Sequence, residues 1–103
     1  MIEVERVDYI RVPVRDIEKA KHFYGEILGL EQNPNSPGDD WVEYETGNVT
    51  FALMTPHTHD YEFAPLPPGT IALRVHGAGF SDPDGNRILL HRRYAPYADG
   101  TTP

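Results

Sequence analysis

The chain has 103 residues, with 16 acidic against 9 basic residues and a formal net charge of -7. This charge opposes binding to nucleic-acid phosphates or to anionic membranes, so neither partner is expected. The absence of cysteine excludes disulfides, thiolate zinc sites and thiol nucleophiles. Residues 1–7 lack the apolar core of a signal peptide and no apolar run could span a bilayer, which predicts a cytoplasmic protein.

A strand followed by a helix opens the chain. Apolar and polar residues alternate over residues 7–14, which is typical of a strand. Asp16 is placed to cap a helix whose apolar residues recur every three or four positions as far as Leu28, and Gly29 is placed to end it. Because a domain of this length buries a small core, we expect a homodimer.

The rest of the chain alternates short strands with turn-rich segments. Proline, glycine and Asx residues mark turns, and alternating apolar residues mark strands. The strands expected are residues 30–32, 41–45, 49–55, 70–75 and 87–93; the connections are the turns at 33–40, 46–48 and 82–85, a proline-rich linker at 57–69 and a tail from residue 94.

Two segments carry a family resemblance. VDYIRVPVRDIEKAKHFYGEILGL (residues 7–30) and FSDPDGNRILLHRR (residues 80–93) resemble the vicinal oxygen chelate superfamily, which contains glyoxalase I, bleomycin-resistance proteins and extradiol dioxygenases. The resemblance implies one α+β domain, residues 1–103, of paired βαβββ modules that form a curved mixed sheet around a cup. The expected parts are a first module at about 5–56, a linker at 57–69, a partial second module at 70–94 and a tail at 95–103.

The second module is incomplete by this comparison, because Val75 runs directly into His76 where the family has a helix and another strand. A segment of about 20 to 30 residues is therefore expected to be missing. The chain would then contain either one long strand exchanged between two subunits of the dimer or an omitted stretch. Omission is favoured, since the break falls between recognisable elements.

Strand alternation divides the side chains between two faces. The continuously apolar set is expected to pack on the helical side: Ile10, Val12, Phe51, Leu53, Ile71, Leu73, Ile88 and Leu90. Their neighbours are expected to line the cup: Tyr9, Arg11, Thr50, Ala52, Met54, Thr70, Ala72, Arg74, Leu89 and His91, with Arg93 as a further candidate. This lining is mixed and partly cationic, which favours a site for a polar ligand.

The resemblance places the family's metal ligands at Tyr9, Ala52, Thr70 and Leu89. None of these is His, Glu or Gln, and alanine and leucine offer no donor atom, so we expect neither a metal nor another cofactor. A second group of candidate ligands comprises His57, His59, Asp60 and Glu62. Because it lies in the proline-rich linker, we interpret it as a solvated loop.

The leading hypothesis is a metal-independent protein that holds a polar or anionic compound, including an aromatic one, in the sheet cavity. The expected ligand-binding residues are Tyr9, Arg11, Ala52, Met54, Thr70, Arg74, Leu89 and His91. The alternative is a lyase, isomerase or epimerase in which His91 or Tyr9 acts as acid and base. A third is an interaction module whose cup is filled. Structural roles compete with each of these: Tyr9 can fill space, the arginines can pair with acids, and His91 can be a buried structural histidine.

Overall fold

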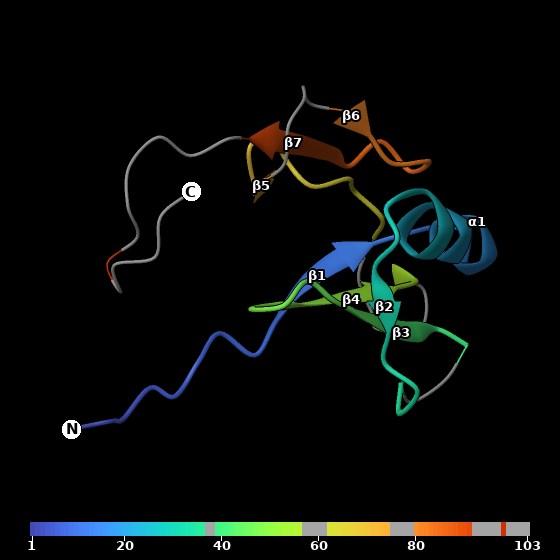
Figure 1. Ribbon diagram of the computed structural model, residues 1–103. Helices are drawn as coiled ribbons and strands as arrows, with labels where there is room; N and C mark the ends of the chain where they lie inside the picture. The colour runs from blue at the N-terminus through green and yellow to red at the C-terminus, as the bar shows by residue number, and fades with distance from the viewer. Residues whose placement is uncertain (37–38, 57–61, 75–79, 92–97, 99–103) are drawn as a thin grey trace.

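The computed structural model describes residues 1–36, 39–56, 62–74, 80–91 and 98, without the side chains of residues 80, 81, 90 and 91. Within these residues, two β-sheets and one helical segment make up a mixed α+β fold (Figure 1). The expected fold class is therefore confirmed.

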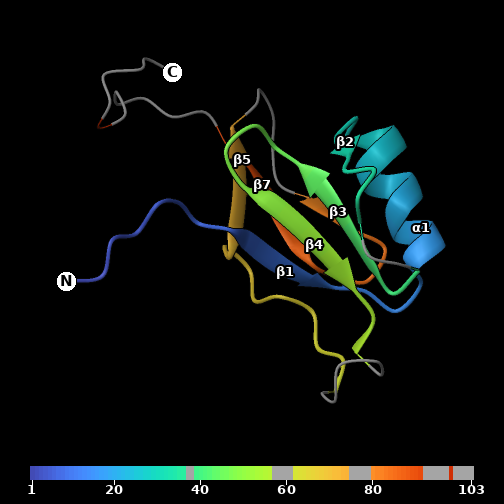
Figure 2. The same ribbon diagram turned by 90° about the horizontal axis from the view of Figure 1, so that it is seen from below.

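The first half of the chain forms a complete βαβββ unit. Its elements are β1 (Tyr9–Pro13), α1 (Ile17–Lys21), η1 (His22–Ile27), β2 (Glu31–Gln32), β3 (Trp41–Glu45) and β4 (Thr50–Met54). The sheet order is β1-β4-β3-β2, with β1 parallel to β4 and the other pairs antiparallel. Figure 2 shows these strands side by side, with the helical segment along one side of the sheet.

The second half repeats part of this arrangement. Its strands are β5 (Ile71–Arg74), β6 (Phe80–Ser81) and β7 (Arg87–His91), in the order β5-β7-β6. β5 is parallel to β7 and β6 is antiparallel to it, which matches β1, β4 and β3 of the first sheet. Between residues 70 and 91, the described part of the chain holds no helix and no counterpart of β2. The incomplete second module is thus confirmed, whereas the junction of Val75 and His76 lies outside the described residues.

The helix begins as the sequence predicts but does not stay an α-helix. The Asp16 carboxylate accepts hydrogen bonds from the backbone N–H groups of Glu18 and Lys19, at 3.0 and 3.1 Å. From His22 the turns widen into a π-helix, and the N–H of Leu28 donates to the carbonyl of Phe23. The expected helical segment is therefore present, and its second half is a π-helix. No helix among the described residues has the length and apolar character to cross a bilayer.

A glycine in the π-helix lets the helix approach the sheet. A Cβ atom at Gly25 would lie 3.1 Å from the hydroxyl oxygen and 3.2 Å from Cε1 of Tyr44, on β3. The wider helical turn therefore rests close against an aromatic ring, which would have to shift by a few tenths of an ångström to admit a side chain at this position. This packing depends on a residue 19 positions away, so local periodicity does not reveal it.

One hydrophobic core joins the two sheets. Its buried members are Val12, Val14, Ala20, Phe23, Tyr24, Val42, Tyr44, Phe51, Leu53, Ile71 and Ile88, with Ile10 and Leu73 packed at its margin. The apolar set expected on the helical side is found in this core, except Leu90, whose side chain lies outside the described part. Strand alternation therefore predicted the buried face of both sheets correctly.

A buried polar cluster, the Asp82 junction, ties the two halves together. It consists of Pro13, Tyr24, Asp82, Asp84 and Asn86. The Tyr24 hydroxyl and the Asn86 amide donate to Oδ2 of Asp82 at 2.7 and 2.9 Å. The backbone N–H groups of Asp84 and Asn86 donate to Oδ1 at 2.9 Å, and the Asn86 amide also donates to the Pro13 carbonyl. Burial, followed by the charge of Asp82, raises the pKa of Tyr24 and keeps its hydroxyl protonated.

The end of β1 and the linker also contact this junction. Oδ1 of Asp84 accepts from the backbone N–H of Arg15 at 3.0 Å and from its Nε at 3.3 Å. The Arg15 guanidinium lies 4.4 Å from the centre of the Phe63 ring, a cation–π distance. The turn expected at residues 82–85 therefore also connects distant parts of the chain. It contacts the end of β1 and the helical segment directly, and the linker through Arg15.

Candidate functional site

The strand register aligns three chemically different side chains on the face opposite the core, which we call the cup face. Ala52 of β4 pairs with Arg11 of β1 on one side and with Glu43 of β3 on the other. Directly paired residues share a face of the sheet. Since Val12 and Leu53 point into the core, this row points away from it. A cation, a methyl group and a carboxylate thus lie side by side.

Two aromatic rings extend over this row. Tyr9 pairs with Thr50, and Trp41 pairs with Met54, so the two rings start on opposite sides of Ala52. Their centroids are 5.3 Å apart with an interplanar angle of 79°, an edge-to-face contact. The two rings belong to the strands on either side of Ala52, and Ala52 is completely buried. The rings therefore form an aromatic platform above a small side chain.

Two carboxylates border the platform. Oε2 of Glu43 accepts from the indole N–H of Trp41 at 2.8 Å, and Oε2 of Glu45 accepts from the Thr50 hydroxyl at 2.7 Å. Trp41, Glu43 and Glu45 are absent from the residues expected in the site. The signal was present, because they alternate with the apolar Val42 and Tyr44 in the same strand. Assigning faces to β3 as well as to the other strands would have identified them.

The second sheet also has a face opposite the core, to which we extend the name cup face. Leu89 pairs with Ala72 in the strand register. Ala72, Arg74 and Leu89 alternate along their strands with residues that face the core, so they point away from it. All three are exposed. Arg74 pairs with His91 in the strand register, but the His91 side chain lies outside the described residues. This sheet adds an apolar surface and a cation.

Thr70 does not line the sheet. β5 begins one residue later, and the Thr70 hydroxyl donates to the carbonyl of Pro67 at 2.7 Å. Its backbone N–H donates to the same carbonyl. The side chain therefore closes the turn that leads into β5, and its expected position in the cup lining is not found. The other expected residues with described side chains (Tyr9, Arg11, Ala52, Met54, Arg74 and Leu89) lie on the cup face.

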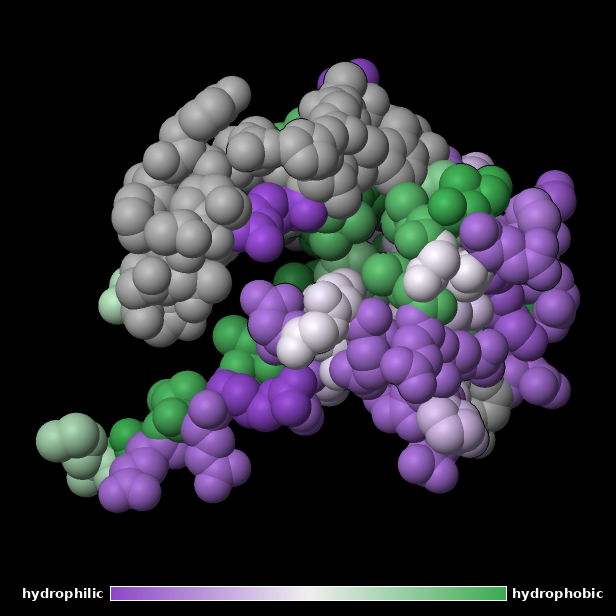
Figure 3. All heavy atoms as spheres, viewed as in Figure 1, coloured by the Kyte–Doolittle hydropathy of each residue, from purple (hydrophilic) through white to green (hydrophobic). Residues whose placement is uncertain are grey.

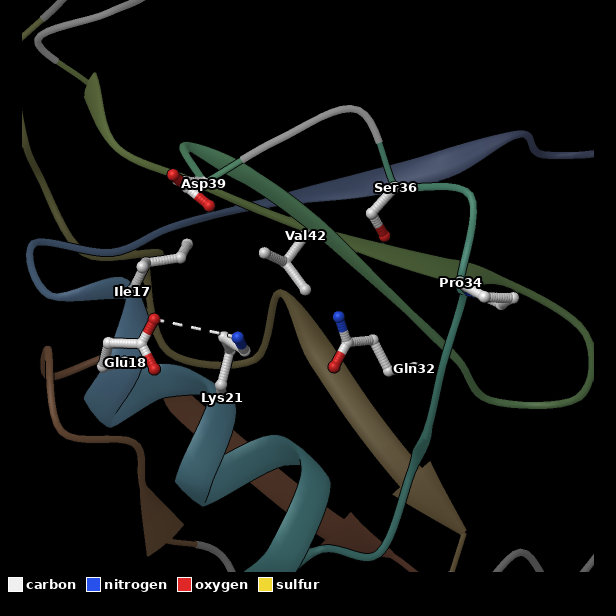
Figure 4. A pocket seen from close by; sticks show the side chains of 8 residues that line it. All are labelled: Ile17, Glu18, Lys21, Gln32, Pro34, Ser36, Asp39 and Val42. Atoms are coloured by element: carbon white, nitrogen blue, oxygen red, sulfur yellow. Dashed lines mark ion pairs between the residues drawn. The ribbon is translucent and has the colours of Figure 1, made fainter.

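A separate hollow lies on the helical side, between α1 and the segment from β2 to β3 (Figure 4). Its volume is about 210 Å³, and an adjoining hollow of about 470 Å³ extends toward Tyr44. Lys21 pairs with Glu18 at 3.7 Å, while the Ser36 hydroxyl donates to the Asn33 carbonyl and accepts from the N–H of Glu43. These polar groups are used within the fold, so we assign no ligand to this hollow.

The metal that the fold family implies does not fit the residues present. Ala52 and Leu89 have no donor atom, the Thr70 hydroxyl is engaged in its turn, and the ring of Tyr9 packs against Trp41. Among the described residues, no group of three or more His, Cys, Asp or Glu side chains could hold a metal ion. The group at residues 57–62 lies, apart from Glu62, outside the described part.

Comparison with known proteins agrees with this architecture. Residues 7–47 match the family model described as bleomycin resistance protein-like N-terminal. The structure is similar to a member of the glyoxalase/bleomycin resistance protein/dioxygenase superfamily from Sphaerobacter thermophilus DSM 20745, with a TM-score of 0.70, 23% identity and coverage of 87% of this chain and 98% of that chain. The chain has the vicinal oxygen chelate fold.

Two further neighbours of this vicinal oxygen chelate fold differ in function. An antibiotic-binding protein from Streptomyces sp. CB03234 has a TM-score of 0.61 and 24% identity, with coverage of 89% of this chain and 98% of that chain. A lactoylglutathione lyase from Agrobacterium tumefaciens has a TM-score of 0.61 and 17% identity, with coverage of 84% and 92%. The search of curated proteins gave no match. The predicted resemblance is confirmed as a fold, and one fold hosts several chemistries.

Proposed function

We propose that this chain is a metal-independent small-molecule-binding protein that holds a polar or anionic compound with an aromatic group against the cup face. The observation that carries the proposal is the aromatic platform of Tyr9 and Trp41 above Ala52, with Arg11 in the same row. A flat ligand gains contact area on such rings, and a guanidinium can grip a carboxylate through two hydrogen bonds. The antibiotic-binding neighbour supports this class of function.

The single tryptophan of the chain provides a direct test, because Trp41 lies in the cup. Its fluorescence should be quenched in a saturable way by aromatic carboxylates such as 1-naphthoate. Acetate and an aromatic cation of similar size serve as comparison ligands and should bind at least about tenfold more weakly. Equal quenching by all three, or none by any aromatic anion, would contradict the proposed ligand class.

Metal independence is tested in the same assay. Elemental analysis of the purified protein should find no stoichiometric divalent ion, and EDTA should leave the 1-naphthoate titration unchanged. A titration that requires added Ni²⁺ or Mn²⁺ would contradict a metal-free site. The physical reason is the donor set, since an alanine and a leucine occupy two of the four positions.

The enzymatic alternative uses His91 or Tyr9 as acid and base. The contact that the structure shows for Tyr9 is an edge-to-face packing with Trp41, which suits a binding surface. The lyase neighbour has the same fold at 17% identity. Chemical conversion of a bound compound, followed by NMR and abolished by His91→Gln or Tyr9→Phe, would establish this alternative in place of simple binding.

A further inference from the structure

An uncharged, proline-rich run lies on the surface of the linker before β5. Residues 62–69 have the sequence EFAPLPPG, and we call residues 64–68 the proline ridge. Every residue of the ridge except Leu66 is exposed. Along residues 1–8, by contrast, hydrophobic and hydrophilic residues are interspersed (Figure 3). Contiguous exposed apolar surface like that of the ridge is typical of an interaction site.

The sequence restricts the backbone of the proline ridge to the polyproline II conformation. Proline fixes φ at about −65°, and a residue that precedes proline is pushed toward the extended or polyproline II region. Each of the five ridge residues is a proline or precedes one. In the structure, residues 62–67 belong to neither a helix nor a strand. The ridge ends in a turn, where the N–H of Thr70 donates to the carbonyl of Pro67.

Burial along this stretch follows the three-residue period of a polyproline II helix. Phe63 and Leu66 are three positions apart and partly buried, whereas the residues between and after them are exposed. Leu66 packs at the margin of the core, and its N–H donates to the side-chain oxygen of Asn86. The Phe63 ring lies against the Arg15 guanidinium. One edge of the segment is thus fixed to the protein, and the other two edges face solvent (Figure 2).

The outward edges carry two pairs of residues that each end in proline, Ala64-Pro65 and Pro67-Pro68. The two terminal prolines are three residues apart, which is about 9 Å in a polyproline II helix. Aromatic-lined grooves recognise this proline spacing in extended peptides. Because Leu66 between the pairs points toward its own protein, a partner can bind both pairs without disturbing that attachment. The backbone is ordered before binding, so docking costs little conformational entropy.

We propose that the proline ridge is a docking site for a partner protein with an aromatic-lined groove that recognises polyproline II segments. Pro65 and Pro68 pack against the aromatic rings of that groove. The chain has no lysine or arginine between Glu62 and Leu73, so the prolines carry the contact in place of an ion pair. The small contact area predicts a transient complex with a dissociation constant of about 10 µM to 1 mM. This site does not depend on the proposed function of the cup face.

Titration of the ¹⁵N-labelled full chain with purified proline-binding domains tests the location of the site. The probes are one SH3, one WW and one EVH1 domain, each added up to about 1 mM. At least one of them should shift the amide signals of Ala64, Leu66 and Gly69. The signal of Gly47, in the connection between β3 and β4, should stay in place. No response to any of the three domains, or shifts confined to other parts of the chain, would overturn the proposal.

Two variants test whether the prolines carry the contact. Pro65→Ala and Pro68→Ala should each weaken binding of the responding domain at least about fivefold. Pro34→Ala is the matched control, because Pro34 is an exposed proline in a different connection. All three variants should keep the urea midpoint of the natural chain, which shows that they are folded. Binding that Pro65→Ala and Pro68→Ala leave unchanged, or that Pro34→Ala weakens equally, would overturn the proposal.

Discussion

The carboxylates of the Asp82 junction and of the cup face lie in different surroundings. The Asp82 carboxylate accepts four hydrogen bonds and is almost completely buried. On the cup face, Glu43 and Glu45 are half-buried, and the arginines on the same face are exposed. The first arrangement satisfies an ionised group inside the protein and connects segments far apart in the chain. The second leaves charge accessible to solvent. Burying a polar group lowers the stability of the fold unless the group is hydrogen-bonded. We therefore expect the junction to act in folding and the cup face to act in binding.

The largest effect should come from removing the acceptor at the centre of the junction. Asp82→Ala leaves the Tyr24 hydroxyl, the Asn86 amide and two backbone N–H groups without their partner. We expect a loss of about 3 to 5 kcal/mol in the free energy of unfolding, measured by urea denaturation. Asp39→Ala, at an exposed position, is the control and should change it by less than about 0.5 kcal/mol. Similar losses for both variants would show that the junction does not stabilise the fold.

Removing a cup cation should separate binding from folding. Arg11→Ala and Arg74→Ala should each weaken 1-naphthoate binding by about 1.5 to 3 kcal/mol if they hold its carboxylate. Because both side chains are exposed, the free energy of unfolding should change by less than about 1 kcal/mol. The exposed Lys19→Ala on the helix controls for a loss of positive charge and should leave the Trp41 titration unaltered. Unchanged affinity in both arginine variants would assign them a structural role.

The junction should also respond to alkaline pH. The pKa of Tyr24 is raised by burial and by Asp82, so the folded protein keeps the proton that the unfolded chain releases near pH 10. Its contribution to stability is therefore complete below pH 10 and is lost as the pH rises above that value. Tyr24→Phe should cost about 1 to 2 kcal/mol at pH 7 and reduce the decline in stability between pH 10 and 11. An unaltered alkaline decline in this variant would contradict the assignment.

The smallest effect is expected from a change within the platform. Trp41→Phe keeps an aromatic ring beside Tyr9 but removes the N–H that donates to Glu43. The lost hydrogen bond is partly exposed, so the free energy of unfolding should fall by about 0.5 to 1 kcal/mol, measured by circular dichroism. A loss above about 3 kcal/mol would mean that the platform belongs to the folding core, and the contrast with the junction would disappear.

Local signals in the sequence determined the elements and their faces. Alternation predicted that Val12, Phe51 and Leu53 are buried, and Asp16 and Gly29 marked both ends of the helical segment. These features depend on neighbouring residues, because strand geometry places alternate side chains on opposite faces and a cap accepts from the N–H groups two and three residues further on. The incomplete second module was predicted from the family resemblance, because Val75 is followed directly by His76 where the family has a helix and another strand.

Only the tertiary structure decided which distant residues meet. Asn86 reaches the Pro13 carbonyl across 73 positions, and Tyr24 reaches Asp82 across 58. Trp41 joined the site because strand pairing brought it to the other side of Ala52 from Tyr9. A one-residue shift in pairing would send these side chains to the opposite face, and that register depends on packing of the whole sheet. The sequence therefore determined which side chains each strand carries on each face, and packing decided which of them come into contact.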